Sequence, residues 1–334
     1  MSKSIFITGA SGFLGAYIVK ELVQKNYRVV ALRRQPRLPF FIPSGIWEKV
    51  EWVDGDLFDL PQLEAGMKGA DAVIHAAAKV SFHPGDRKEL YRTNVEGTAN
   101  VVNMALETGV PRLLHVSSVA AIGRDAAGGT IHEDQKWDPE RKTTHYAQSK
   151  YRSELEVWRG MAEGLSAVII NPSTILGYGD WDHSSCRIFK TAYQEFPWYT
   201  TGINGFVDVE DVAKAGILLL ESPIESERYI INGENWGFRD LFNTIADAFE
   251  KKRPYRLATP FWSGLAWKLE YLKYLLSGEK PLLTRESARV ANSRTYFSNE
   301  KLIQAIPGFS FTPLQTTLIR ACRQYLQAAK GTKE

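Results

Sequence analysis

Three glycines lie where the first apolar run of the chain leads into the first segment of helical periodicity. The turn that joins these two segments contains Gly9, Ser11, Gly12, Phe13, Leu14 and Gly15. Glycine permits a tight turn, a close approach of a phosphate to the main chain, and close contact between a helix and a strand. The helix N-terminus adds free N–H donors and the positive end of a dipole, which together attract an anion. The turn therefore predicts that these six residues bind the pyrophosphate of a dinucleotide.

Short apolar runs alternate with helical segments through the first half of the chain. The runs that we expect to form strands are residues 5–8, 28–32, 50–53, 72–75, 113–117 and 167–171. The clearest helical periods cover residues 13–24, 89–106 and 146–161. Strands that alternate with helices require right-handed crossovers and give a parallel sheet with helices on both faces. We therefore expect a doubly wound α/β (Rossmann) fold.

The character of the chain changes after residue 171. We expect residues 1–171 to form the dinucleotide-binding domain and residues 172–334 to form a smaller, mostly helical substrate-binding part, with a portion of residues 200–235 completing the sheet. The helices predicted in this second part cover residues 238–249, 259–276, 284–291, 299–305 and 313–327, with a brief strand at residues 228–231. The loops at residues 35–45 and 123–137 follow predicted strands, and such folds bind ligands at the carboxyl ends of their strands. We expect a substrate pocket in the cleft between the two parts.

Composition and charge exclude several other classes of protein. Hydrophobic residues make up 44% and charged residues 24%, as in an ordinary globular protein. The net charge is +3, and the basic residues are interleaved with acidic ones, so we expect no nucleic-acid partner. Cys186 and Cys322 are the two cysteines, and they show no disulfide or metal-ligand spacing, so we expect no metal and a reducing cytoplasm.

We also expect no transmembrane segment and no signal peptide. The N-terminal apolar run is too short for a signal peptide and leads directly into the glycine turn. The longest candidate for a membrane span, residues 257–276, carries Lys268, Glu270 and Lys273 near its centre. A spanning helix needs about 20 mostly apolar residues, so this segment is better interpreted as an amphipathic helix.

Arg33 and Arg34 follow the second predicted strand, roughly 20 residues beyond the glycine turn. An acidic residue at this point would hold the ribose hydroxyls of NAD, and no acidic residue is present there. A guanidinium instead binds the adenosine 2′-phosphate with charge-assisted hydrogen bonds. The pair therefore predicts NADP rather than NAD, with two solvated surface arginines as the alternative.

Tyr146 and Lys150 lie one helical turn apart at the start of the helix that precedes the sixth predicted strand. A phenol with a pKa near 10 exchanges protons poorly at neutral pH. A nearby ammonium group and an oxidised nicotinamide would both lower that pKa. Ser118 ends the fifth predicted strand and could donate a hydrogen bond to a substrate oxygen as charge develops on it. With Asn94, these residues form the candidate catalytic set.

Taken together, these motifs resemble those of the extended short-chain dehydrogenase/reductase superfamily, of the NAD-dependent epimerase/dehydratase type. The resemblance rests on the glycine turn and on segments 54–57, 75–78, 94–98, 116–118, 146–150, 171–173 and 206–213. It implies that Tyr146 is the acid/base, that Lys150 holds the nicotinamide ribose, and that Ser118 binds the reacting oxygen. Asn94 would support the site through its helix.

The same resemblance implies further cofactor contacts and an assembly. Asp56 and Leu57 would touch the adenine, Ala76, Ala77 and Ala78 the adenosine side, and Pro172 and Ser173 the nicotinamide end. Members commonly form homodimers, here through the helices predicted at residues 89–106 and 146–161.

The choice among reactions is guided by similarity within the superfamily. Segments 116–123, 261–274 and 281–284 resemble dihydroflavonol reductases and 3β-hydroxysteroid dehydrogenases. We therefore expect an NADP-dependent oxidoreductase that acts on a carbonyl or alcohol of a fairly apolar small molecule, which Phe261, Trp262 or Trp267 would help to cover. The alternatives are a nucleotide-sugar epimerase or dehydratase that uses the same residues, and a non-catalytic dinucleotide sensor. Sensors of this kind often lose the tyrosine or the lysine, and both are present here.

Overall fold

The computed structural model describes residues 2–123, 128–140, 143–259 and 291–331. Two of the predicted helices, at residues 259–276 and 284–291, lie almost entirely outside these ranges. The same holds for the aromatic residues Phe261, Trp262 and Trp267, which we expected to cover the substrate.

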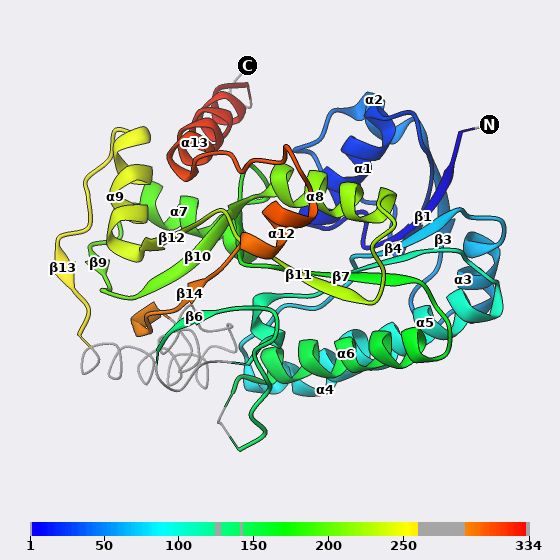
Figure 1. Ribbon diagram of the computed structural model, residues 1–334. Coiled ribbons are helices and arrows are strands. Elements are labelled where there is room, and N and C mark those ends of the chain that lie inside the picture. The colour runs from blue at the N-terminus through cyan, green and yellow to red at the C-terminus, as the bar shows by residue number, and fades with distance from the viewer. Residues whose placement is uncertain (1, 124–127, 141–142, 260–290, 332–334) are drawn as a thin grey trace.

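A seven-stranded parallel sheet forms the centre of the molecule (Figure 1). Its strands are β1 (Ser4–Thr8), β2 (Arg28–Arg33), β3 (Val50–Asp54), β4 (Ala72–His75), β5 (Leu113–Val116), β7 (Ala167–Pro172) and β11 (Glu227–Ile231). They lie side by side in the order β11-β7-β5-β4-β1-β2-β3, and every neighbouring pair is parallel. The predicted doubly wound α/β fold is therefore confirmed, with each of the first six strands within one residue of its predicted ends. The winding reverses between β1 and β4, which creates the crevice where such folds bind ligands.

Helices cover both faces of this sheet, as Figure 1 shows. The helices α1 (Phe13–Gln24) and α8 (Val209–Glu221) lie on one face, and α3 (Leu60–Met67), α5 (Gly97–Glu107) and α6 (His145–Ala162) lie on the other. The strands are apolar on both sides because both sides are buried. In β1, for example, Ile5 and Ile7 belong to one core and Phe6 to the other, with exposed fractions of 2%, 0% and 0%.

The helix predicted at residues 89–106 is interrupted by a π-helical turn. The structure has α4 (Arg87–Tyr91), the π turn (Arg92–Glu96) and then α5. Asn94, in this turn, is 1% exposed. The hydrophobic periodicity alone did not reveal the π-helical turn, because a π turn rotates the apolar face of the helix by only a fraction of one helical turn. Such turns are often found at functional sites.

The second part of the chain has a core of its own beside the sheet. It contains α7 (Arg187–Tyr193), α9 (Phe238–Ala248) and α13 (Leu314–Gly331), which pack around β8 (Thr174–Leu176), β10 (Ile203–Asp208) and β12 (Glu234–Gly237). Shorter elements are α2 (Ser44–Trp47), β6 (Thr130–Ile131), β9 (Trp198–Tyr199), β13 (Arg256–Leu257), β14 (Tyr296–Phe297) and α12 (Glu300–Ala305). The strand β11, from the second part of the chain, pairs with β7, which ends the first part. The domain boundary expected at residue 171 stays a prediction. No helix within the described ranges is long and apolar enough to cross a membrane.

The glycine turn brings three elements into close main-chain contact. Gly9 has a φ of +76°, and a Cβ added to it would lie 2.5 Å from the backbone nitrogen of Ala77, just after β4. A Cβ on Gly15, in α1, would lie 2.0 Å from the carbonyl oxygen of Gly9. Both distances are well below van der Waals contact, so these two glycines allow α1 and β4 to pack tightly against the end of β1.

Gly15→Ala should lower the free energy of unfolding by at least about 2 kcal/mol, because the backbone carbonyl of Gly9 cannot move aside without shifting β1. The measurement is urea unfolding of the two proteins. Gly45→Ala is the matched control, since Gly45 lies in α2 with no atom within 4 Å of its added Cβ. That control should leave stability unchanged or raise it by up to about 1 kcal/mol. Equal stability of the two variants would contradict the packing argument.

Candidate active site

A cavity of about 2490 Å³ opens at the carboxyl ends of the central strands. Of the residues selected from the sequence, those that line it are Gly9, Ser11, Gly12, Phe13, Leu14, Gly15, Arg34, Ala76, Ala78, Ser118, Tyr146, Lys150, Pro172 and Ser173. Pockets for a single small molecule usually measure about 300 to 1,000 Å³. The cavity is therefore large enough for an extended dinucleotide together with a second molecule.

Tyr146 lies in the first turn of α6 and forms a side-chain hydrogen bond with Ser118. The helix begins there because the Thr144 hydroxyl caps it, accepting from the backbone N–H of Ala147 at 3.0 Å. The ring of Phe82 meets the Tyr146 ring edge to face, with centroids 5.8 Å apart. Burial raises the pKa of Tyr146, and the hydrogen bond from Ser118 opposes part of that rise. The lowering expected from the sequence requires positive charge beside the phenol, which burial alone does not supply.

Lys150 lies one turn further along α6 and is 2% exposed. Its ammonium group donates to the carbonyl oxygen of Val116, the last residue of β5, at 2.9 Å. Burial lowers the pKa of Lys150 to about 8, and the carboxylate of Glu154 opposes this effect. The lysine is therefore charged at neutral pH, but its pKa lies closer to neutral pH than that of an exposed lysine.

The two neighbouring serines after β5 differ in their surroundings. Ser118 begins a short 3₁₀ turn (Val119–Ala121), and its hydroxyl accepts from the N–H of Ala120 at 3.2 Å while also bonding to Tyr146. Ser117 lines the same cavity, but its buried hydroxyl has no hydrogen-bond partner among the described residues. The serine selected from the sequence is thus the one that contacts Tyr146.

Asn94 is not among the residues that line the cavity. Its amide nitrogen donates to the Lys79 carbonyl and to the Ser149 hydroxyl, each at 2.9 Å, and its oxygen accepts from the Lys79 N–H at 2.7 Å. Asn94 therefore fastens the segment after β4 to the residue that precedes Lys150. This geometry makes it a positioning residue for the helix that carries Tyr146 and Lys150.

Arg33 and Arg34 point to different surroundings. The Arg33 guanidinium is ion-paired with Asp54 of the adjacent strand at 2.7 Å and stacks over Trp52, with 5.1 Å to the ring centroid. Arg34 is exposed and lines the cavity, as does Arg37, which sequence reasoning missed. Arg37 could have been found as a third basic residue in the proline-containing loop after β2.

Three other expected cofactor contacts lie outside the cavity lining. Asp56 accepts from the N–H of Phe58 at 2.7 Å, and Leu57, 7% exposed, packs beneath α5. The main chain of Ala77 lies directly against Gly9. These three residues therefore lie behind the residues that line the cavity.

The cavity has the features that a bound dinucleotide requires. The N-terminus of α1 faces it, with Gly12 at the N-cap position and no side chain capping the free N–H groups. The buried hydroxyls of Ser117 and Ser173 line it without a partner among the described residues. Buried polar atoms are rarely left unpaired, so both hydroxyls are available to a ligand.

Comparison with known proteins decides the family. The model of the NAD dependent epimerase/dehydratase family matches residues 5–232. The chain belongs to this family. Sequence relatives include "Putative dihydroflavonol 4-reductase" of Synechocystis sp., 31% identical over 317 residues (92% of this chain and 90% of the relative), and "Sterol demethylase protein B" of Methylococcus capsulatus, 32% identical over 295 residues (86% and 88%). The crystal structure of gox2253 is similar over 98% of this chain and 99% of that chain, with 30% identity and a TM-score of 0.82.

Membership in the epimerase/dehydratase family confirms the resemblance seen in the sequence. The chain is an NAD(P)-dependent enzyme of the extended short-chain dehydrogenase/reductase type, with reductases among its relatives. The family binds a nicotinamide dinucleotide, and the glycine turn, the uncapped helix N-terminus and the two free hydroxyls fit that group.

Two buried histidines lie beneath the candidate active site. His75 ends β4, with its ring nitrogens 2.7 Å from the Thr8 hydroxyl and 3.0 Å from the Thr98 hydroxyl. His115 lies beside it in β5, with ring centroids 5.3 Å apart. Burial, and next the charge of Lys150, lower the pKa of His75 to about 3. Burial, Lys150 and then His75 also lower the pKa of His115.

Stability should therefore fall as the pH drops below the unfolded-state pKa of about 6.5, because the unfolded chain binds protons that the folded chain cannot. His75→Gln should remove one such group and reduce the loss between about pH 7.5 and about pH 5.5 by roughly 1.4 kcal/mol. Urea unfolding at the two pH values measures this. His132→Gln, at an exposed position, should keep the unmodified protein's pH dependence. An unchanged pH dependence in His75→Gln would contradict the burial argument.

Proposed function

We propose that the chain is an NADP-dependent oxidoreductase that interconverts a carbonyl and an alcohol on a fairly apolar small molecule. The observation that carries the proposal is the hydrogen bond between Ser118 and Tyr146 at the wall of a cavity that Lys150 also lines. A hydroxyl pair of this kind can hold a carbonyl oxygen and deliver a proton to it. The bound nicotinamide would supply or accept the hydride.

In this proposal Tyr146 exchanges the proton with the substrate oxygen. Burial keeps its phenol protonated, which suits proton donation as a carbonyl is reduced. The Lys150 ammonium, held at the Val116 carbonyl, contributes positive charge on the same face of α6 and is the candidate donor to the nicotinamide ribose. Ser118 holds the oxygen on which negative charge develops. Gly9, Ser11, Gly12, Pro172 and Ser173 would hold the cofactor along the cavity floor.

The substrate class is inferred from apolar side chains around the cavity. Leu38, Phe40, Val80 and Phe196 are 40%, 65%, 52% and 51% exposed, and all four line it. Exposed large apolar side chains gathered at a cavity favour an apolar ligand. The names of the dihydroflavonol 4-reductase and sterol demethylase relatives agree with this class. A nucleotide sugar would bring a second pyrophosphate, which the sequence offers four arginines to bind: Arg187, Arg239, Arg285 and Arg289. Arg187 lines the cavity, whereas Arg239 stacks over Tyr199, and the other two lie outside the described residues.

Tyr146→Phe should reduce NADPH-linked turnover of bulky apolar ketones by about 100-fold or more while NADPH still binds, because only the proton donor is removed. Loss of NADPH absorbance measures turnover, and fluorescence titration measures binding. Tyr151→Phe, on the same helix with its ring stacked on Trp137, is the matched control and should stay near full activity.

Three results would count against this assignment. Full activity of Tyr146→Phe would remove Tyr146 from the proposed acid/base role. Interconversion of nucleotide sugars without net change in the cofactor would replace the reductase by the epimerase alternative. Binding of the dinucleotide without turnover of either class would favour the sensor alternative.

The preference for NADP rests on the arginines of the loop after β2. Arg34 and Arg37 both line the cavity, and within the described ranges no hydrogen bond or ion pair engages either guanidinium. Arg33 is already paired with Asp54, so a 2′-phosphate would compete with that carboxylate for it.

The Arg34→Ser, Arg37→Ser double variant should narrow the affinity gap between NADPH and NADH at least tenfold, mainly by weakening NADPH. Each charge-assisted phosphate contact contributes about 1.5 to 3 kcal/mol. Arg33→Ser is the comparison and should have a smaller effect, since its guanidinium is held by Asp54. Binding of each dinucleotide is followed by fluorescence titration. Equal affinities for NADPH and NADH in the unmodified protein would refute the preference.

Two further expectations accompany the proposal. A homodimer through α5 and α6 would cover Leu155, which is 46% exposed on α6. A reducing cytoplasm agrees with Cys186 and Cys322, which are buried and free.

A further inference from the structure

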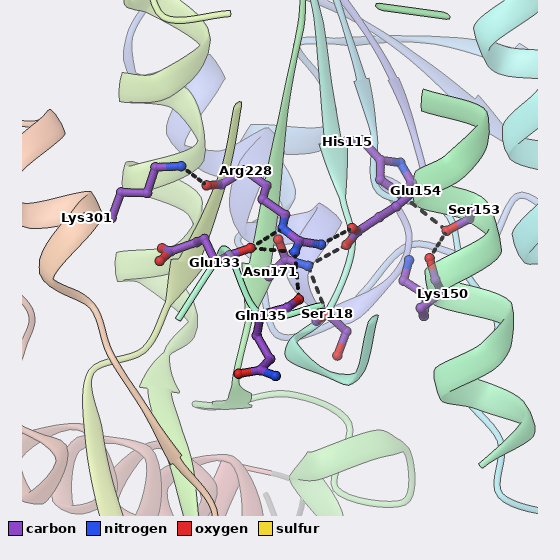
Figure 2. Close-up of polar contacts among 10 residues, drawn as sticks. All are labelled: His115, Ser118, Glu133, Gln135, Lys150, Ser153, Glu154, Asn171, Arg228 and Lys301. Carbon is purple, nitrogen blue, oxygen red and sulfur yellow. Dashed lines mark hydrogen bonds and ion pairs between the residues drawn. The ribbon is translucent and has the colours of Figure 1, made fainter. Parts of the chain in front are cut away.

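Glu154 carries a buried carboxylate one helical turn beyond Lys150 on α6, and its side chain is 1% exposed. Its partner is Arg228 of β11, at 3.1 Å (Figure 2). The Arg228 guanidinium is fixed in turn by the backbone carbonyls of Glu133, at 2.8 Å from its Nε, and Gln135, at 3.3 Å. An ion pair this deep is costly to bury, so its position beside the candidate catalytic residues calls for an explanation.

Asn171 joins this ion pair to Ser118. Its amide nitrogen donates both to the Glu154 carboxylate and to the carbonyl oxygen of Ser118, the latter at 3.0 Å. Figure 2 shows Asn171 between the two groups. The carboxylate therefore orients the amide, and the amide fixes the main chain of the residue whose hydroxyl meets Tyr146.

Glu154 also interacts electrostatically with Lys150. Among the described residues, His75 and His115 on neighbouring strands and Glu154 on α6 interact electrostatically with Lys150, and Tyr146 lies one turn before it on the same helix. The two histidines are neutral in the folded protein and offer the ammonium no counter-charge. Within the described part of the chain, the carboxylate of Glu154 favours the charged lysine against the effect of its burial.

We propose that Glu154 is a positioning residue with two effects: it holds Ser118 in place through Asn171, and it supplies the counter-charge for the Lys150 ammonium. Arg228 sets the strength of both effects, because it holds the carboxylate in position and offsets part of its charge. The inference rests on the proposed function, since it assigns Lys150 to the cofactor ribose and Ser118 to the substrate oxygen.

The test compares Glu154→Gln with Arg228→Gln in the full-length protein. Both variants break the same ion pair, but they change the charge near Lys150 in opposite directions. The readout is the NADPH dissociation constant from about pH 6 to about pH 10, because binding should weaken as Lys150 loses its proton. Relative to the unmodified protein, Glu154→Gln should move the midpoint of this weakening down by about half a pH unit or more, and Arg228→Gln should move it up.

Two controls separate charge from position. Glu156→Gln removes a partly exposed carboxylate on the same helix, paired with Arg159, and should leave the midpoint unchanged. Glu154→Asp keeps the charge but shortens the reach to Asn171, so its midpoint should stay near that of the unmodified protein while kcat falls several-fold. A role in stability alone would lower the melting temperature of the variants without moving any midpoint.

Midpoints that move in the same direction in Glu154→Gln and Arg228→Gln, or that do not move, would overturn the inference. Should the Glu154 variants fail to fold, Arg228→Gln still decides: a raised midpoint supports the inference, and an unchanged or lowered one refutes it. The titrations use no carbonyl substrate, so the failure of the proposed reaction would leave the midpoints readable. Unmoved midpoints would refute the role of Glu154 even where carbonyl turnover is found.

Discussion

The site depends on the main-chain contact between Gly9, Gly15 and Ala77. No side chain separates α1, β1 and β4 at this point, and an added Cβ would lie 2.0 to 2.5 Å from a backbone atom. The contact lets the N-terminus of α1 open into the crevice where the sheet reverses its winding. The strand register then brings Thr8, His75 and His115 side by side, so the loops that follow these strands all face one cavity. The proposed position of the cofactor at the N-terminus of α1 depends on that alignment.

Beneath the cavity lies a layer of buried polar groups that ordinary core packing would exclude. Lys150, His75 and Glu154 are each 1% to 2% exposed. Their burial is tolerated because nearly every group has a specific partner: Val116 for the lysine, Thr8 and Thr98 for the histidine, Arg228 and Asn171 for the glutamate. Neutral histidines avoid the cost of further buried charge, and the Glu154 carboxylate faces both the Arg228 guanidinium and the Lys150 ammonium. The layer therefore gives up some stability to keep a charged lysine at the wall of the cavity.

The sequence predicted those parts of the molecule that local patterns encode. Apolar runs located the first six strands within a residue. The glycine turn and the spacing of Tyr146 and Lys150 located the parts of the cavity lining that lie at the start of α1 and of α6. What it did not reveal depends on contacts between distant segments. Arg33 forms an ion pair with Asp54 on the neighbouring strand. Asn94, in the π turn, forms hydrogen bonds with Lys79 and Ser149. Neither contact leaves a periodic or compositional signal.

The ion pair between Glu154 and Arg228 connects the two parts of the chain. Arg228 lies on β11, 74 residues beyond Glu154, yet it fixes the carboxylate that faces Lys150. The β11 strand reaches this position only because the chain, after building β8 and β10 beside the cavity, returns to pair with β7. The second part of the chain therefore supplies walls of the cavity and also a charged group that contacts the first part. Correct closure of the sheet at β11 is therefore a condition for the geometry around Ser118, Tyr146 and Lys150, although no residue of β11 lines the cavity.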